Sequence, residues 1–309
     1  MEYLLLLLGF TFLIFSGRLL ITSSVSIAKR FNLSPFVIGV TIVAIGTSAP
    51  ELLVSLTGAL KGHTDVAVYN IVGSNISNIL LVLAIATIIL PIQVQARAIW
   101  FDGSFMLTFS LLTWFFLRDL RFSSIEGAFI LLLLVLFVIM SLVHSRRDTQ
   151  DDLPSGKPGK KSWIAVVGVI GASGGLALGA NLLVDNAVSI ARQIGLSERI
   201  ISVSMIALGT SIPELTTSVI AAFRKQTDIS IGNIMGSNIF NIGFVLGLTT
   251  IIKPIDANPL ILSFDIFWFV GVAVLLILIL LFPPKSILSR WKGLVMLFGY
   301  LIYLYLILK

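Results

Sequence analysis

The chain has 309 residues, of which 57% are hydrophobic and only 12% are charged, and its mean hydropathy is +1.05. Soluble globular domains carry about 25% charged residues. This composition therefore excludes a water-soluble enzyme, a secreted domain and a disordered chain, and it predicts an all-α polytopic membrane protein. The lysines and arginines behind the net charge of +6 lie between apolar runs, which is typical of membrane topology signals and not of nucleic-acid binding.

A membrane-spanning helix needs about 20 mostly apolar residues. Division of the chain at charged clusters, prolines and polar turns predicts ten spans, at residues 3–28, 36–60, 66–90, 98–117, 123–143, 162–191, 199–223, 229–252, 260–282 and 288–308. The first span has no basic leading segment and no small-residue cleavage site, so we expect a retained helix and not a signal peptide. Residues 145–161 combine Pro, Gly and mixed charges, which predicts a flexible linker between helical halves at 1–144 and 162–309.

Basic residues are unevenly distributed between the two sides of these spans. Loops after odd-numbered spans hold 13 of the 21 lysines and arginines, while loops after even-numbered spans and the C-terminus hold 7. The remaining one, Arg18, lies within the first span. The positive-inside rule then places the 145–161 linker in the cytoplasm and both termini on the outer side of the cell membrane. The lipid bilayer is the expected environment, and no obligatory protein partner is evident.

The sequence repeats itself at a constant offset. GTSAPE at 46–51 returns as GTSIPE at 209–214, and GSNISNI at 73–79 returns as GSNIFNI at 236–242, both 163 residues later. The same offset pairs Asp65 with Asp228, Asn70 with Asn233, Pro91 with Pro254 and Asp102 with Asp265. Each copy holds five predicted spans, and an odd number forces the copies into inverted topology. Inverted repeats with interrupted helices are typical of secondary transporters.

Polar side chains follow one face of four predicted spans. Three polar residues recur at positions i, i+4 and i+8, which share a helix face: Thr47, Glu51 and Ser55; Asn70, Ser74 and Asn78; Thr210, Glu214 and Ser218; and Asn233, Ser237 and Asn241. A carboxylate at mid-membrane costs about 2.5–3.5 kcal/mol on insertion scales. Glu51 and Glu214 have no Lys or Arg on their own helix faces, so we expect each to need a partner or a cation.

The available ligand atoms are all oxygen. Pro50 and Pro213 lack an amide hydrogen, so the carbonyls of Gly46 and Gly209 lose their helical donor. Carbonyls, hydroxyls, amides and carboxylates suit Ca²⁺, which takes six to eight oxygens at about 2.3–2.6 Å. With no cysteine and two histidines in the chain, copper and zinc are disfavoured. Taken singly, such Pro, Ser, Thr and Asn residues also serve helix bending and packing.

GTSAPE with GSNISNI, repeated as GTSIPE with GSNIFNI, resembles the paired repeats of the sodium/calcium exchanger family, part of the cation/calcium exchanger superfamily. The resemblance covers residues 36–90 and 199–253, and the short linker resembles prokaryotic members. It implies that the second, third, seventh and eighth spans form a core around the ions. The first and sixth spans would slide past that core to alternate access. It also implies Ca²⁺ and Na⁺ as transported ions without a cofactor. The implied ligands are the side chains of Glu51, Glu214, Thr47, Ser48, Ser74, Asn78, Thr210, Ser211, Ser237 and Asn241, and the carbonyls of Ala44 and Ala207.

Asn241 marks a departure within that resemblance, because some relatives, potassium-dependent exchangers among them, carry Asp at this position. With Asn78 and Asn241, only two carboxylates remain at the centre. Two carboxylates neutralise one Ca²⁺ or two Na⁺, and a third Na⁺ would make the cycle electrogenic. This pattern argues against potassium co-transport.

The favoured function is therefore exchange of Na⁺ for Ca²⁺ by alternating access, and not an enzymatic activity. A proton/calcium antiporter is the nearest alternative, although such relatives tend to carry an Asn-containing motif in place of Gly-Thr-Ser. A cation channel with the same ligands and a non-transporting scaffold are further alternatives.

Charges outside the repeated motifs give two more expectations. Arg18 and Asp185 fall within the first and sixth spans, and each aligns about one turn from the symmetry mate of the other. We expect either an ion pair between these helices or an Arg18 side chain that reaches the membrane interface. Asp102 and Asp265 lie near predicted span starts, where helix N-capping is expected.

Overall fold

Nearly all of the described chain is helical. The computed structural model describes residues 1–95, 98–148, 162–195 and 209–308. The first half contains α1 (Glu2–Phe31), α2 (Pro35–Ile38), η1 (Gly39–Val43), α3 (Ala44–Thr47), α4 (Ala49–Leu60), α5 (Thr64–Ser77), η2 (Asn78–Leu83), α6 (Ala84–Ile89), β1 (Ile92–Gln93), η3 (Ala98–Asp102), α7 (Gly103–Phe116), η4 (Leu117–Asp119), β2 (Arg121–Phe122) and α8 (Ser124–Asp148). The second half contains α9 (Ser162–Gln193), α12 (Ile212–Phe223), α13 (Thr227–Phe240), η6 (Asn241–Leu246), α14 (Gly247–Ile252), β3 (Ile255–Asp256), η7 (Ile261–Asp265), α15 (Ile266–Leu281), β4 (Ile287–Leu288) and α16 (Arg290–Leu308).

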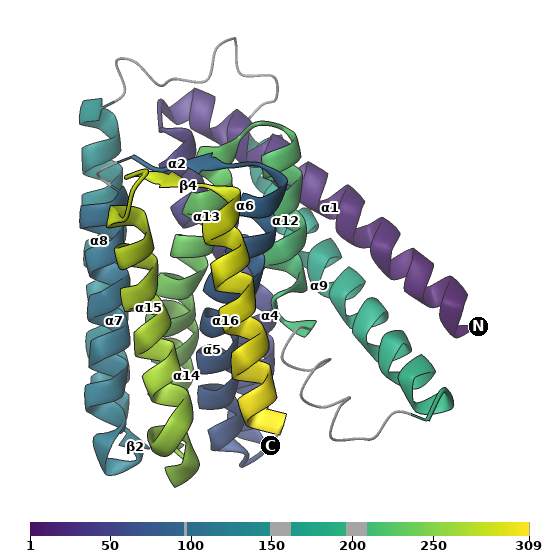
Figure 1. Ribbon diagram of the computed structural model, residues 1–309, viewed down its shortest axis with the longest axis vertical. Coiled ribbons are helices and arrows are strands. Elements are labelled where there is room, and N and C mark those ends of the chain that lie inside the picture. The colour runs from purple at the N-terminus through teal and green to yellow at the C-terminus, as the bar shows by residue number, and fades with distance from the viewer. Residues whose placement is uncertain (96–97, 149–161, 196–208, 309) are drawn as a thin grey trace.

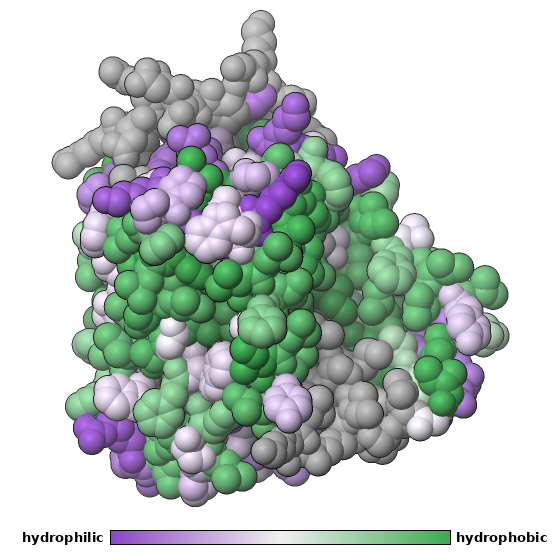
Figure 2. Space-filling view, viewed as in Figure 1, coloured by the Kyte–Doolittle hydropathy of each residue, from purple (hydrophilic) through white to green (hydrophobic). Residues whose placement is uncertain are grey.

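The helices confirm the all-helical polytopic fold. Among the described residues, eight helices are long and apolar enough to cross a membrane, or nine if the bent segment from Pro35 to Leu60 is one span. The predicted span 199–223 is described only from residue 209, and its helix α12 is short. Figure 2 shows hydrophobic side chains across the middle of the molecule and hydrophilic ones toward its two ends, as expected for a protein surrounded by lipid.

Element bounds recur at the same offset of 163 residues as the sequence motifs. The correspondence holds for α4 with α12, α5 with α13, η2 with η6, α6 with α14, β1 with β3 and η3 with η7. The two-residue strands pair between the halves, β1 with β4 and β2 with β3, both antiparallel. The duplicated sequence thus produces duplicated local structure.

Helices α1 and α9 form an antiparallel pair that extends away from the remaining helices (Figure 1). Small residues line their contact: Ser16 lies against Gly175, and Ser23 lies against Gly168. At one end, the side chain of Gln193 donates a hydrogen bond to Glu2. Small residues allow membrane helices to approach closely, which explains why this pair packs so extensively.

The expected ion pair between Arg18 and Asp185 is not formed. Both residues lie in described helices and both are exposed. The helix register explains the result. Because Ser16 faces Gly175 and Ser23 faces Gly168, Arg18 lies opposite residues near Ser173. That position is about 12 residues, or about 18 Å of helix, from Asp185.

This separation predicts independent effects of the two charges. We expect the losses of transport rate in Arg18→Ala and Asp185→Ala, expressed as free energies, to add in the double variant to within about 0.3–0.5 kcal/mol. Initial rates of Ca²⁺ uptake by the three variants measure this. A double variant no worse than Arg18→Ala alone would show that the charges meet during the transport cycle.

Candidate cation site

The repeated GTS motifs lie where new helices begin. Ser48 separates α3 from α4 with φ −81° and ψ 4°, and Ser211 precedes α12 with φ −85° and ψ 0°. The helices on either side of Ser48 are bent by 42°. Pro50 and Pro213 lie in the first turn of α4 and α12, where the missing amide hydrogen costs least. The prolines thus start new helices inside the protein.

This arrangement places each glutamate in the first turn of a helix. Glu51 is in the first turn of α4, and Glu214 is in the first turn of α12. A helix N-terminus presents free amides and a partial positive charge. The local backbone therefore offsets part of the cost of a buried carboxylate.

The remainder of that cost is not offset by any described basic side chain. Glu51 and Glu214 are both 0% exposed. Neither oxygen of Glu51 has a hydrogen-bond partner among the described residues, and the same holds for Oε2 of Glu214. Glu214 Oε1 accepts a hydrogen bond from Ser237 at 3.4 Å. The negative charge of Glu214 repels a negative charge on Glu51. A buried pair of like charges is unfavourable unless a cation joins it or a proton neutralises one member.

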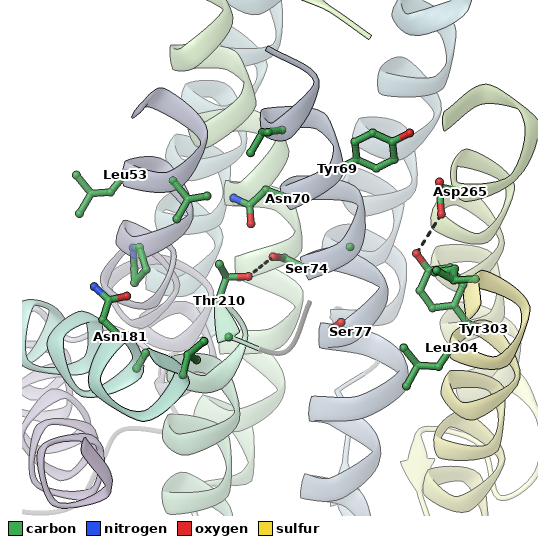
Figure 3. A pocket seen from close by; sticks show the side chains of 18 of the residues that line it. Leu53, Tyr69, Asn70, Ser74, Ser77, Asn181, Thr210, Asp265, Tyr303 and Leu304 are labelled. Carbon is green, nitrogen blue, oxygen red and sulfur yellow. Dashed lines mark hydrogen bonds between the residues drawn. The ribbon is translucent and has the colours of Figure 1, made fainter. Parts of the chain in front are cut away.

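Hydroxyl groups link the two halves crosswise. The Thr47 hydroxyl lies 3.2 Å from the Ser237 hydroxyl, and the Ser74 hydroxyl lies 2.9 Å from the Thr210 hydroxyl. The 163-residue offset relates these two contacts, so the threonine of each GTS motif meets the serine of the other half's GSN motif. Figure 3 shows the Ser74–Thr210 contact. Four of the predicted ligands are thereby brought into two contacting pairs.

Other members of the polar stripes hold helices together within each half. Asn70 donates to the Ser55 hydroxyl at 2.9 Å, and Asn233 donates to the Ser218 hydroxyl at 3.2 Å. These symmetric bonds join α5 to α4 and α13 to α12. Here the packing interpretation of a membrane asparagine applies.

Asn78 and Asn241 begin the π-helical segments η2 and η6, a geometry often found at functional sites. Both are 0% exposed. The side-chain nitrogen and oxygen of Asn78 both lack a hydrogen-bond partner among the described residues, and so does the side-chain oxygen of Asn241. Segment η6 packs against α4, which carries Glu51, and η2 packs against α12, which carries Glu214. Each asparagine thus lies on a segment beside the other half's glutamate helix.

The structure supports the predicted carbonyl ligands less than the predicted side-chain ligands. The Ala44 carbonyl already accepts the Ser48 amide at 2.9 Å and the Thr47 hydroxyl at 3.3 Å. Because a carbonyl has two lone pairs, a cation at Ala44 would have to displace the hydroxyl. Ala207 lies outside the described residues.

Several buried oxygens remain without a hydrogen-bond partner in the described chain: Ser48 Oγ, Glu51 Oε1 and Oε2, Asn78 Oδ1, Ser211 Oγ, Glu214 Oε2 and Asn241 Oδ1. Buried polar atoms are nearly always satisfied, so a set of oxygens with two formal negative charges suits a bound cation. No cluster of three or more His, Asp or Glu occurs in the described ranges. The unpartnered atoms are all oxygens, the ligand type that hard cations prefer.

A cavity of about 780 Å³ adjoins this cluster. Its wall includes Ser74 and Thr210 as well as Asp185 and Asp265. Figure 3 shows Ser74, Thr210 and Asp265 at the cavity. Asp265 does not cap a helix as expected, because it continues from η7 into α15 with helical φ and ψ. Its carboxylate instead accepts a hydrogen bond from the Tyr303 hydroxyl at 3.2 Å. Asp102 likewise makes no side-chain cap for α7.

Fold and site together define a polytopic helical membrane protein of the cation-transporter class. The family model described as sodium/calcium exchanger protein matches residues 1–143 and 164–309. The chain belongs to this family, as a prokaryotic-type member. The family consists of exchangers of Na⁺ and Ca²⁺ and is not an enzyme family.

Individual relatives extend over almost the whole chain. CaxA of Alkalimonas amylolytica is 38% identical over 97% of both chains. The sodium/calcium exchanger MaX1 of Methanosarcina acetivorans is 28% identical over 98% of this chain and 97% of its own. The structure of the sodium-calcium exchanger NCX_Mj soaked with zero Na⁺ and Ca²⁺ matches with a TM-score of 0.83 and 30% identity, covering 97% of each chain.

Proposed function

We propose that this protein is a secondary antiporter that exchanges Na⁺ for Ca²⁺ across the cell membrane by alternating access. Two inverted five-helix repeats, residues 1–144 and 162–309, form the transporter, joined by a cytoplasmic linker at 145–161 with both termini outside. The observation that carries the proposal is the pair of fully buried carboxylates, Glu51 and Glu214, which lack a described basic partner. The names of MaX1 and NCX_Mj favour Na⁺ as the counter-ion.

In this proposal the ligands are the side chains and carbonyls that the sequence predicts. The crosswise contacts Thr47–Ser237 and Ser74–Thr210 support a site shared by the two halves. The unpartnered oxygens of Ser48, Ser211, Asn78 and Asn241 support their assignment as further ligands.

The charge of the site enforces exchange. One Ca²⁺ or two Na⁺ neutralise the two carboxylates, whereas an empty site that takes up no proton keeps two negative charges. Moving an uncompensated ion through low dielectric costs several kcal/mol even after relaxation, on the order of 20 kcal/mol in the idealised limit. The empty protein therefore does not change the side to which its site is open, and Ca²⁺ leaves on one side only when Na⁺ replaces it.

The α1–α9 pair is the proposed moving element. It packs mainly on itself and contacts the site helices over smaller areas, through α12 and α3. One of these contacts places Gly17 of α1 against Ile220 of α12. Gly17 presents no side chain to interlock with α12 at this contact, which supports sliding of α1 and α9 past the site.

Flux in proteoliposomes tests the proposal. We expect ⁴⁵Ca²⁺ uptake into Na⁺-loaded vesicles and none into K⁺- or choline-loaded vesicles. A separate set of vesicles carries a pH gradient without Na⁺. Uptake driven by that gradient would assign the protein as a proton/calcium antiporter, and uptake without any counter-ion would assign it as a channel.

A further inference from the structure

A hydrogen-bonded relay inside the protein leads to Asn241. The side-chain amide of Asn75, in α5, donates to the backbone carbonyl of Asn238 in α13 at 3.0 Å. The side-chain oxygen of Asn75 accepts a hydrogen bond from the side-chain amide of Asn241, also at 3.0 Å. All three residues are at least 97% buried. Asn75 is absent from the ligand set that the sequence predicts, although the repeated GSN motif contains it.

The orientation of both amides follows from hydrogen-bond chemistry. A backbone carbonyl only accepts, so the Asn75 atom that faces Asn238 must be the amino nitrogen. The other end of Asn75 is then its oxygen, and Asn241 must turn its own amino nitrogen toward it. The relay therefore fixes which way the Asn241 amide points.

The consequence is a side-chain oxygen on Asn241 with no hydrogen-bond partner in the described part of the chain. With its nitrogen engaged by Asn75, Asn241 keeps Oδ1 buried and without a hydrogen-bond partner among the described residues. Segment η6, which Asn241 begins, packs against α4 with its buried Glu51. We propose that Asn75 is a positioning residue that holds Asn241 with its oxygen available to the transported cation. This inference rests on the proposed function.

The relay also explains why an amide stands at position 241. An aspartate there would set a carboxylate oxygen against the oxygen of Asn75, and two acceptors at hydrogen-bond distance repel. Asn75 cannot turn over to relieve this contact without losing its bond to the Asn238 carbonyl. Asn75 thus favours a neutral ligand at 241 and holds the central site at two negative charges.

The symmetry mate of Asn75 provides a matched control. Asn238 has the same motif position, yet its side-chain nitrogen donates to Ile234 of its own helix at 3.1 Å. It does not bond Asn78, whose amide atoms both lack a partner in the described chain. Removing the Asn238 side chain leaves its backbone carbonyl, so the acceptor for Asn75 survives.

The test compares Asn75→Ala with Asn238→Ala in equilibrium ⁴⁵Ca²⁺ binding and in uptake kinetics. Loss of a residue that orients a metal ligand typically weakens binding by about 10–100-fold. We expect at least a tenfold higher dissociation constant and half-saturating Ca²⁺ concentration for Asn75→Ala, with a smaller change in maximal rate. For Asn238→Ala we expect less than about a threefold change. Asn75→Leu has nearly the shape of asparagine and replaces the alanine variant if the cavity prevents folding.

A second comparison tests whether Asn75 acts through Asn241. In an Asn241→Ala background, adding Asn75→Ala should leave Ca²⁺ binding unchanged within about twofold. The inference would be overturned if the effects of Asn75→Ala and Asn241→Ala on the Ca²⁺ dissociation constant multiplied in the double variant. Equal effects of Asn75→Ala and Asn238→Ala would also overturn it. Glu51→Gln in the same assays separates failure of this inference from failure of the proposed function. If the proposed function is wrong, Glu51→Gln binds Ca²⁺ normally; if only the role of Asn75 is wrong, Glu51→Gln still loses Ca²⁺ binding.

Discussion

Replacement of Glu51 or Glu214 by glutamine is expected to reduce Na⁺-driven Ca²⁺ uptake at least about 30-fold. Each substitution keeps the shape of the side chain and one oxygen ligand but removes one of two buried negative charges. Removing the anionic partner of a buried, charge-paired cation costs about 2–5 kcal/mol, and about 2 kcal/mol corresponds to a factor of about 30. A single carboxylate also leaves Ca²⁺ with a net charge in the site. Initial uptake rates in Na⁺-loaded proteoliposomes measure the effect.

Glu126→Gln is the matched control for these substitutions. Glu126 lies in the first turn of α8 and accepts hydrogen bonds from the amide and hydroxyl of Ser123, each at 2.7 Å. Glutamine has an oxygen that accepts the same bonds, so we expect uptake within about twofold of the parent. Uptake that survives in both Glu51→Gln and Glu214→Gln, with the control normal, would remove these carboxylates from the transport site.

The spans were predictable because lipid requires long apolar runs, and charges and prolines end them. The predicted span 66–90 corresponds to α5 through α6 at residues 64–89, and the predicted span 260–282 to η7 through α15 at 261–281. Helix α8 continues to Asp148, four residues into the predicted linker, and the rest of the linker lies outside the described residues. The repeat offset recurs in the element bounds because equal sequences meet equal local constraints.

Interactions between helices were less accessible to sequence reasoning. Of the two alternatives for Arg18, the ion pair with Asp185 was wrong, because an alignment of repeats does not contain the register in which α1 and α9 cross. Asp265 was predicted as a cap from its position, whereas η7 joins α15 without interruption and Tyr303 reaches its carboxylate. Both errors concern tertiary geometry, which a one-dimensional pattern does not specify.

For the candidate site, too, the sequence predicted the residues of the motifs but not the contacts between helices. Motif and spacing identified the glutamates, serines and threonines, and the structure brings Thr47 to Ser237 and Ser74 to Thr210. The pattern did not distinguish Asn75 from an ordinary helix-packing asparagine. Its significance depends on a backbone carbonyl of the other half, Asn238, that no sequence pattern reveals. The ligand roles themselves remain predictions until binding is measured.

Gly236→Ala is expected to destabilise the protein strongly, because α13 crosses the broken span at residues 35–47 with almost no space between the backbones. A Cβ atom at Gly236 would lie 2.5 Å from the Val40 carbonyl oxygen and 2.8 Å from the Ala44 Cβ. Overpacking typically costs about 1–3 kcal/mol, and contact with backbone atoms leaves no side chain free to move. We expect about 3 kcal/mol or more, which corresponds to roughly 6–12 °C in the unfolding temperature. Thermal unfolding of the detergent-purified protein measures it.

The same close approach connects stability to transport. Ser237 follows Gly236 directly, and Thr47 lies one turn beyond Ala44, so a helix pushed outward at Gly236 separates the hydroxyls that now lie 3.2 Å apart. Gly236→Ala should therefore lose Ca²⁺ affinity even below its unfolding temperature. Gly271→Ala in α15 is the control, because its added Cβ meets no described atom within 4 Å and alanine favours the helix. Equal unfolding temperatures for the two variants would show that α13 and the broken span do not touch at Gly236.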